Sequence, residues 1–320
     1  MQTAWTHKES PFHAGELAVQ EALGVRKKMD TFARKVVRDH LPQEHREFYP
    51  QLPFLVLGTV DNRGRPWASL VTGEPGFVSS PDEHILKIRA DPLPGDPLNE
   101  TLHAGADIGI LGIQLETRRR NRLAGQINAT TPDGFSIHID QAFGNCPRYI
   151  QSRSVNFPAS KPIGTPVPRR NSRLSDDARA LIERSDTLFI ATAYAEESDD
   201  VSHGADVSHR GGKPGFVKVE ADDALVFPDF SGNNHFNTVG NIVANPKAGM
   251  LFADFETGDV VYLSGDAEIV WSGPQLEAFD KAERLIRIRP AELIEVSGGL
   301  PLSFDFVDYS PALERTGAWP

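Results

Sequence analysis

The sequence predicts a mainly β protein with peripheral helices, built from two copies of one small β-barrel on the same chain. Its 320 residues suit about two domains of roughly 150 residues each. Short apolar runs separated by turn residues, the pattern of antiparallel strands, fill two long stretches of the chain. These two stretches repeat the same order of features, which indicates a shared fold.

The chain is predicted to open with helices. Apolar residues recur at roughly helical spacing among charged positions in residues 13–47. We assign residues 1–50 to a helical segment that covers a barrel. The apolar residues are Leu17, Ala22, Leu23, Met29, Phe32, Val36 and Val37.

The first predicted barrel spans residues 51–155. It opens with an apolar run from Phe54 to Val60, a turn at residues 61–64, and a second run from Trp67 to Thr72. Runs of this kind joined by a short turn are typical of a hairpin. A later strand is predicted from Phe135 to Asp140.

A linker is predicted at residues 156–170, because its four prolines forbid a regular helix and disfavour a central strand. Residues 171–320 then form the second barrel with a C-terminal extension. Ser175 is expected to cap a short helix that runs through Arg184, with acidic residues in its first turn. Strands resume at Leu188.

The internal repeat predicts how the two halves correspond. From Ala104 and Ala244 onward the halves align without a gap at an offset of 140 residues. Chance similarity between β-rich segments is the alternative, but ordered matches over four segments argue against it. Two like barrels in one chain can pack about a pseudo-twofold axis, as in a homodimer. The aligned features are Phe54–Val60 with Leu188–Tyr194, Pro75–Val78 with Pro214–Val217, Glu116-Thr117 with Glu256-Thr257, and Gly125 with Gly265.

Composition excludes several classes of function. The formal net charge of −11 disfavours non-specific binding of nucleic acid. No apolar run approaches the roughly 20 residues of a membrane span, and the N-terminus does not resemble a secretion signal, so we expect a cytoplasmic protein. Cys146 is the single cysteine, and no Cys/His set has zinc-site spacing, so neither a disulfide nor a metal is expected.

Two turns in the second half have the composition of a phosphate site. Arg210-Gly-Gly-Lys213 offers two cations on a flexible loop, and Ser231–Asn234 offers amide donors and free backbone N–H groups. A short helix is predicted to follow from Asn237 and to stop at Asn245-Pro246, and its N-terminus would face the same place. The alternative is a pair of ordinary solvated turns.

Arg118, Arg120 and Arg122 alternate along a predicted strand, so all three would point to one face. Three unpaired cations cannot be buried. That face is therefore either open to water, or it meets an anion such as a cofactor, a substrate or acids of the other half.

Several segments resemble one known family. They are DVSHRGGKPGFVKV, LVFPDFSGNNHFNTVGNIVANPKAGMLF and VYLSGDAEIV in the second half, and RGRPWASLVTGEPGFV, GDPL, TRRRNRLAGQI and FGNCPRYIQSR in the first. From about Phe12 to Trp319 the chain resembles the flavin-binding split-barrel family related to pyridoxamine 5'-phosphate oxidase. The resemblance implies two tandem split barrels that form an intrachain pseudo-dimer, with FMN at their interface.

The resemblance also implies which residues hold the cofactor. A polar residue five positions before the strand glycine reaches the flavin ring in related oxidases; counted from Gly125 it is Arg120, and its counterpart in the other half is Val260. One flavin site per chain is therefore the simpler inference. Family members often carry Arg at the place of His235 and Pro at that of His209, so one phosphate cation is missing or replaced by imidazolium. The predicted FMN-binding residues are Ser208, His209, Arg210, Lys213, Asn233, Asn234, Asn237, Arg120 and Trp67.

Further residues are assigned to the surroundings of the ring. Asn145, Cys146 and Arg148 are expected to line the ring or a substrate cavity, although a lone cysteine is more often a buried apolar residue. Core packing is the alternative for Trp67 and Trp319. A contact with phosphate or substrate, rather than with a metal, is expected of the nearby histidines, which are His203, His209 and His235.

Three functions remain open from the sequence. The first is an FMN-dependent oxidoreductase that transfers hydride or electrons at flavin N5 to or from a small molecule. Since no Rossmann G-x-G-x-x-G follows a strand, NADH or NADPH would dock only transiently as a donor. The second is a flavin-binding electron-transfer or carrier module without turnover, and the third is a haem-handling split barrel. A homodimer of two-barrel chains is also compatible with the sequence.

Overall fold

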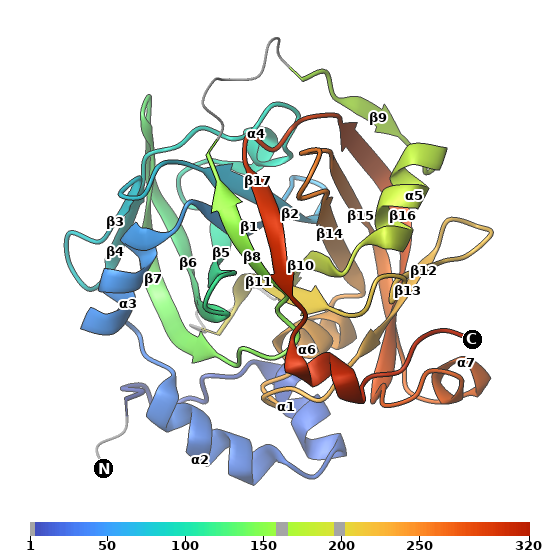
Figure 1. Cartoon of the computed structure of the whole chain (residues 1–320). Helices are drawn as coiled ribbons and strands as arrows, with labels where there is room; N and C mark the ends of the chain where they lie inside the picture. Colours follow the sequence, from blue (N-terminus) through green and yellow to red (C-terminus); the bar gives the residue numbers. More distant parts are fainter. Residues whose placement is uncertain (1–3, 158–165, 195–201) are drawn as a thin grey trace.

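Two β-sheets of identical topology form the body of the protein (Figure 1). The computed structural model describes residues 4–157, 166–194 and 202–320. The first sheet has the strand order β2-β1-β5-β6-β7-β4-β3 and the second the order β11-β10-β14-β15-β16-β13-β12. Strand for strand the two orders match, so the predicted pair of tandem split barrels is confirmed.

The strands of the first barrel lie between residues 54 and 145. They are β1 (Phe54–Val60), β2 (Pro66–Thr72), β3 (Val78–Ser79), β4 (Ile85–Ile88), β5 (Asp107–Gln114), β6 (Arg119–Thr131) and β7 (Gly134–Asn145). The strands of the second barrel are β10 (Thr187–Tyr194), β11 (Gly204–Gly211), β12 (Lys218–Val219), β13 (Leu225–Asp229), β14 (Lys247–Ala253), β15 (Val260–Val270) and β16 (Arg284–Val296).

The ungapped part of the predicted repeat is confirmed at its most distinctive point. Strand β6 bulges at Gly125 and β15 bulges at Gly265, 140 residues later. A Cβ atom at either glycine would lie 1.9 Å from a carbonyl oxygen of the neighbouring strand, so only glycine fits.

The predicted alignment of the first strands is wrong by one residue. Val56 pairs with Leu111, and Phe189 pairs with Leu251. Because Leu111 and Leu251 correspond at the offset of 140, Val56 corresponds to Phe189, and the offset of these strands is 133 rather than 134. Both strands are buried on both faces, so neither shows the alternation that would fix the register.

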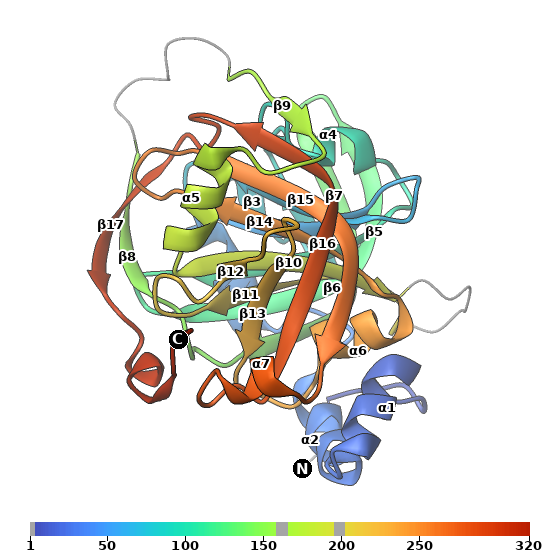
Figure 2. The same cartoon turned by 90° about the vertical axis from the view of Figure 1, so that its right-hand side faces the viewer.

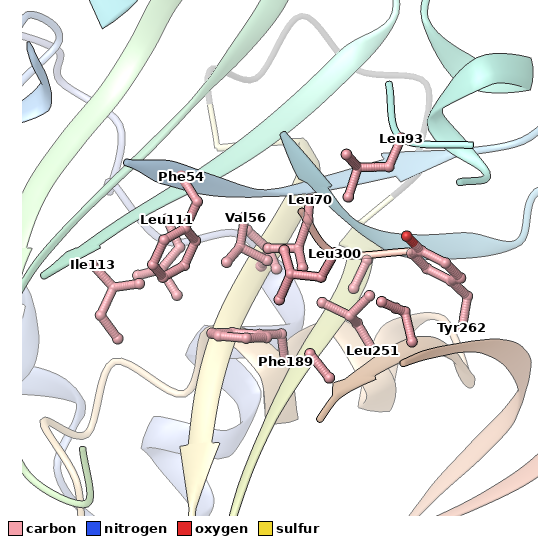
Figure 3. Packing of buried hydrophobic residues seen from close by; sticks show 14 of the residues in the cluster. Phe54, Val56, Leu70, Leu93, Leu111, Ile113, Phe189, Leu251, Tyr262 and Leu300 are labelled. Atoms are coloured by element: carbon pink, nitrogen blue, oxygen red, sulfur yellow. The ribbon is translucent and has the colours of Figure 1, made fainter. Parts of the chain in front are cut away.

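The two barrels meet through backbone contacts and a shared apolar core. A Cβ atom at Gly109 would lie 2.7 Å from the Ala205 carbonyl oxygen, and one at Gly249 would lie 2.2 Å from the Pro66 carbonyl oxygen. These two contacts are related by the repeat, so the barrels pack about a pseudo-twofold axis. Figure 3 shows the core between them, to which both halves contribute side chains. Its labelled members are Phe54, Val56, Leu70, Leu93, Leu111, Ile113, Phe189, Leu251, Tyr262 and Leu300.

The N-terminal helices lie at one end of the molecule, beside α6 (Figures 1 and 2). The prediction of one helical segment over residues 13–47 is wrong in its continuity, because the chain turns at Gly24 with φ of 68° and is extended at Val37. Helix α1 crosses α6 where a Cβ atom at Gly15 would lie 2.3 Å from the Gly240 carbonyl oxygen. The helices are α1 (Ala14–Ala22), α2 (Arg26–Val36), α3 (Gln43–Phe48), α4 (Leu98–Thr101), α5 (Asp176–Arg184), α6 (Asn237–Ala244) and α7 (Pro274–Glu277), with 3-10 turns η1 (Tyr49–Gln51) and η2 (Pro311–Arg315).

The segments around the predicted linker tie the halves together. Residues 158–165 of that linker lie outside the described residues, and β9 (Arg169–Asn171) pairs with β16. The predicted cap of α5 is confirmed, since Ser175 Oγ accepts from the Ala178 N–H. Strand β17 (Ser303–Asp308) of the C-terminal extension pairs with β8 (Ser152–Asn156). In the described part of the chain, no helix has the length and apolar character needed to cross a membrane.

Candidate functional site

A pocket lies where the ends of β6 and β7 of the first barrel meet β11, the turn after β13, and the N-terminus of α6 in the second. We call it the seam pocket. It is lined by Arg120, Arg122, Asn145, Cys146, Arg148, Tyr149, Ser208, His209, Arg210, Gly211, Pro228, Asp229, Phe230, Gly232, Asn233, Asn234, Phe236, Asn237, Thr238, Val239, Glu283 and Arg284.

Most of the predicted site residues line this pocket, although they come from separate parts of the chain. The helix predicted from Asn237 is confirmed as α6, which ends before Asn245-Pro246 as expected. The predicted residues in the lining are Ser208, His209, Arg210, Asn233, Asn234, Asn237, Arg120, Asn145, Cys146 and Arg148.

Lys213 and Trp67 do not line the seam pocket. Lys213 turns toward the C-terminal extension, where its Nζ donates to the Thr316 carbonyl oxygen at 2.8 Å. Trp67 is buried in the core between the barrels, and its Nε1 donates to Asp61 Oδ2 at 3.1 Å. Trp319 also packs in a core, against Phe279.

The lining of the seam pocket is cationic in a protein whose net charge is −11. It contains five arginines but only two carboxylates, Asp229 and Glu283. A concave surface of one charge with low-dielectric walls concentrates the field and attracts counter-ions. The local charge therefore selects an anion against the overall charge of the molecule.

Arg120 is a buried cation of the lining whose hydrogen-bond partners are all neutral. It is 8% exposed, and no carboxylate of the described residues lies within 4 Å of it. Its Nε donates to the Cys146 carbonyl oxygen at 2.7 Å, and an Nη lies 3.3 Å from His209 Nδ1. Burial lowers the pKa of Arg120 to about 10, so the side chain still carries its charge at neutral pH. A buried charge held only by neutral acceptors calls for an anion.

Arg122 points to the same face as Arg120, as predicted, but Arg118 does not. Arg118 lies in the turn before β6 with φ of 57°, and it pairs with Asp308 at the C-terminal extension. The alternative of a water-exposed face is wrong for Arg120 and Arg122, which are both buried. Arg122 forms an ion pair with Asp206 and donates to Asn237 Oδ1 at 3.2 Å.

His209 is a neutral donor in the seam pocket. Burial, together with repulsion by Arg120 and Arg210, holds its pKa well below the usual value. Because Nδ1 faces the Arg120 guanidinium, Nδ1 is the acceptor and Nε2 carries the proton. Nε2 is buried and has no hydrogen-bond partner among the described residues.

His235 and His203 lie away from the lining. The His235 ring is surrounded by aromatic rings, with centroids 5.3 Å from Phe12 and 5.5 Å from Phe143. Burial lowers the pKa of His235 to about 4, so the prediction that an imidazolium replaces a phosphate cation here is wrong. His203 pairs with Asp107 at 3.2 Å.

Asp229 binds two arginines, Arg210 and Arg284, and the sequence did not predict that these two lie together. It accepts from Arg210 at 2.7 Å and from Arg284 at 2.8 Å. Arg284 lies 55 positions after Asp229, and only the pairing of β13 with β16 brings the two side by side. The Nε atoms of both arginines are buried without a hydrogen-bond partner in the described part of the chain. Both guanidiniums thus keep unused donor capacity at the pocket.

Two hydrogen bonds join the barrels beside the pocket. Tyr149 OH donates to the Ser231 carbonyl oxygen at 3.0 Å, and Asn233 Nδ2 donates to Asn145 Oδ1 at 3.1 Å. The cavity has a volume of about 90 Å³. Cofactor sites commonly reach about 300–1,000 Å³, so a whole cofactor requires more space than this cavity has.

Comparison with known proteins finds a family match in the second half of the chain. Residues 174–297 match the family model described as pyridoxamine 5'-phosphate oxidase. This second half belongs to the pyridoxamine 5'-phosphate oxidase-related split-barrel family. None of the curated proteins compared with the chain matches it.

Solved structures resemble about two fifths of the chain. Group A Streptococcus HupZ has 17% identity and a TM-score of 0.32, over 40% of this chain and 97% of its own. A putative pyridoxamine 5'-phosphate oxidase of Lactobacillus delbrueckii has 15% identity and a TM-score of 0.30, over 38% of this chain and 94% of its own. A pyridoxamine 5'-phosphate oxidase-related, FMN binding protein of Nostoc punctiforme has 14% identity and a TM-score of 0.25, over 39% of this chain and 81% of its own.

The donors of the seam pocket suit the phosphate of a flavin in such a split barrel. Buried guanidinium and imidazole nitrogens without acceptors are what an anionic oxygen would satisfy. The cavity of about 90 Å³ has room for a phosphate group but not for a whole flavin.

Proposed function

We propose that this protein binds FMN in the seam pocket and acts as a flavoprotein oxidoreductase on a small molecule. The observation that carries the proposal is Arg120, a buried guanidinium that faces the pocket without a carboxylate partner among the described residues. Membership of the second half in a flavin-binding split-barrel family supports the choice of a flavin as the anion.

Each half would contribute a different part of the site. The second barrel would hold the phosphate through Ser208, Arg210 and the turn at Asn234, and the first barrel would present Arg120 toward the ring. A bound flavin supplies hydride or electron transfer at N5, and the residues of the chain bind it, orient it and control access to it. NADH or NADPH would dock transiently as a donor. A carrier module without turnover uses the same pocket, and it differs only in that no donor reduces the flavin.

Binding of FMN is tested by titrating the purified protein with FMN and with riboflavin, which lacks the phosphate. We expect FMN to bind at least about 100-fold more tightly, because charge-assisted hydrogen bonds to a desolvated phosphate are each worth about 1.5–3 kcal/mol. Flavin fluorescence provides the readout. Heat release followed by absorbance and mass measurement identifies any ligand that is copurified. Equal affinity for the two flavins would contradict a phosphate site.

A variant pair assigns the binding to the seam pocket. The double variant Arg210→Ala with Asn234→Ala removes two donors from the lining and should weaken FMN at least about 10-fold. Lys213→Ala is the matched control, because Lys213 lies near Arg210 in sequence but points to Thr316. Equal loss in the two variants, or no loss in either, would place the flavin elsewhere. A Soret band in the same preparation would instead favour the haem-handling function.

A further inference from the structure

Two equivalent hydrogen bonds show which residues of the two halves correspond. Thr59 Oγ1 lies 2.8 Å from Thr101 Oγ1, and Asn241 Nδ2 donates to Thr192 Oγ1 at 2.9 Å. The two bonds join equivalent elements, β1 with α4 and β10 with α6, at offsets of 133 and 140 residues. These are the offsets that the strand pairing gives independently. The correspondence therefore extends through both helices that follow the barrel turns.

Asp96 is a buried carboxylate at the N-terminal end of α4. Its oxygens accept from the Leu70 N–H at 3.0 Å and from the Leu98 N–H at 2.8 Å. The hydroxyls of Ser69 and Tyr262 act on the same carboxylate, and they oppose the burial that raises the pKa of Asp96 to about 6. Donors from both barrels thus enclose the side chain and favour its charged form against the effect of burial.

The seam pocket contains the counterparts of those donors without a counterpart of the carboxylate. Strand β2 pairs with β1 as β11 pairs with β10, which gives these two strands an offset of 139, so Ser208 replaces Ser69 and His209 replaces Leu70. At the offset of 140, Thr238 replaces Leu98 and Arg122 replaces Tyr262. All four line the seam pocket. At the place of Asp96 stands Phe236, which also lines it and has a left-handed backbone with φ of 63°.

The other seam is closed by apolar side chains as well as by Asp96. Tyr262, Leu70 and Leu300 pack together there, as Figure 3 shows. Val260, the counterpart of Arg120, is also buried in this cluster. Two arginines of the seam pocket, Arg120 and Arg122, thus have the uncharged counterparts Val260 and Tyr262 at the closed seam.

We propose that one oxyanion position exists at each seam, and that the chain fills one with its own Asp96 and leaves the other for the ligand. Within the phosphate site of the proposed function, one phosphate oxygen then lies among Ser208, the His209 backbone N–H, Thr238 and Arg122, and the other oxygens face Arg210 and the turn at Asn234. The ion pair with Asp206 holds the Arg122 side chain at this place. The protein binds one ligand per two-barrel chain. The proposal rests on the proposed function for the identity of the ligand as FMN, but the anion position itself rests on the repeat.

The test moves the internal anion to the other seam. Phe236→Asp places a carboxylate at the equivalent of Asp96, and Phe236→Asn is the matched control with the same shape and no charge. Both residues tolerate the left-handed backbone at this position. We expect one FMN per wild-type chain, and a dissociation constant for Phe236→Asp at least about 100-fold above that of Phe236→Asn, since like charges at one site exclude each other. Thermal unfolding of both variants checks that they fold.

Either of two results would overturn the proposal. One is that Phe236→Asp and Phe236→Asn bind FMN with equal affinity, and the other is that each wild-type chain binds two FMN. If the wild-type protein binds no FMN, the proposed function fails and inorganic phosphate becomes the probe. Phosphate should then raise the unfolding temperature of the wild type and of Phe236→Asn but not of Phe236→Asp. The same response in all three proteins, including none, would overturn the anion position. If Phe236→Asp does not fold, the test is made on the wild-type protein by NMR. Phosphate should shift or protect the amide or hydroxyl signals of Ser208 and Thr238. Unchanged signals would reject the site.

Discussion

At the scale of single residues, the site depends on which charged groups are buried and which are neutral. The sequence identified Arg120 and His209, but it could not reveal that one is a buried cation and the other a neutral donor. Burial depends on how β6 of one half meets β11 of the other, which no local pattern encodes. His235 shows the same limit, because the phenylalanines that surround it come from distant segments.

His235 should make the protein sensitive to acid. Its folded pKa of about 4 lies below the ordinary value of 6.5, so the unfolded chain binds a proton that the folded chain does not. The stability this neutral side chain contributes is present above pH 6.5 and is lost as pH falls toward 4, by up to about 3 kcal/mol. His235→Phe should flatten the fall of the free energy of unfolding between pH 6.5 and 4, measured by denaturant titration.

The control for this prediction is His103→Gln, which alters an exposed histidine. Its pH profile should follow the wild type. Some acid sensitivity should persist in His235→Phe, because burial also lowers the pKa of His45 to about 4. An unchanged slope in His235→Phe would mean that His235 does not titrate as a buried neutral group.

At the scale of elements, the sequence predicted those features that local chemistry determines. The cap of α5, the extent of α6 and the correspondence of Gly125 with Gly265 follow from residue types at fixed positions. The bulges at these two glycines were not predicted. The alignment of β1 with β10 in the repeat could not be predicted exactly, because both strands are buried on both faces. The break at Gly24 was also missed, since helical spacing continues across it.

We expect the loop after β7 to control access to the seam pocket. Tyr149 holds it to the turn after β13 through one hydrogen bond to the Ser231 carbonyl oxygen. Tyr149→Phe removes that bond, and we expect FMN association and dissociation each to be faster by about 2- to 10-fold, consistent with a bond worth about 0.5–1.5 kcal/mol. Stopped-flow flavin fluorescence measures both rates. Tyr309→Phe, at an exposed tyrosine, should leave them unchanged, and identical rates in all three proteins would exclude this control of access.

At the scale of the whole molecule, duplication gave two equivalent seams that have since diverged. The sequence indicated this asymmetry through the pairing of Arg120 with Val260. It did not reveal Asp96, whose role appears only when the hydrogen bonds of the two halves are compared. One seam became part of the core that joins the barrels, and the other kept a cationic pocket in an acidic protein.

This division explains why a chain with two barrels needs one site. The closed seam stabilises the pseudo-dimer through buried apolar surface, each large side chain contributing about 1.5–3 kcal/mol. The seam pocket carries unsatisfied donors, which reduce stability until an anion is bound. Ligand binding should therefore stabilise the whole molecule rather than one half.

The most direct test of the account is a crystal structure of the protein grown with FMN. It should contain one FMN per chain, with phosphate oxygens within hydrogen-bond distance of Ser208, Thr238 and Arg122, and with Asp96 unchanged at the closed seam. A phosphate bound outside the seam pocket, or a second FMN beside Asp96, would contradict it.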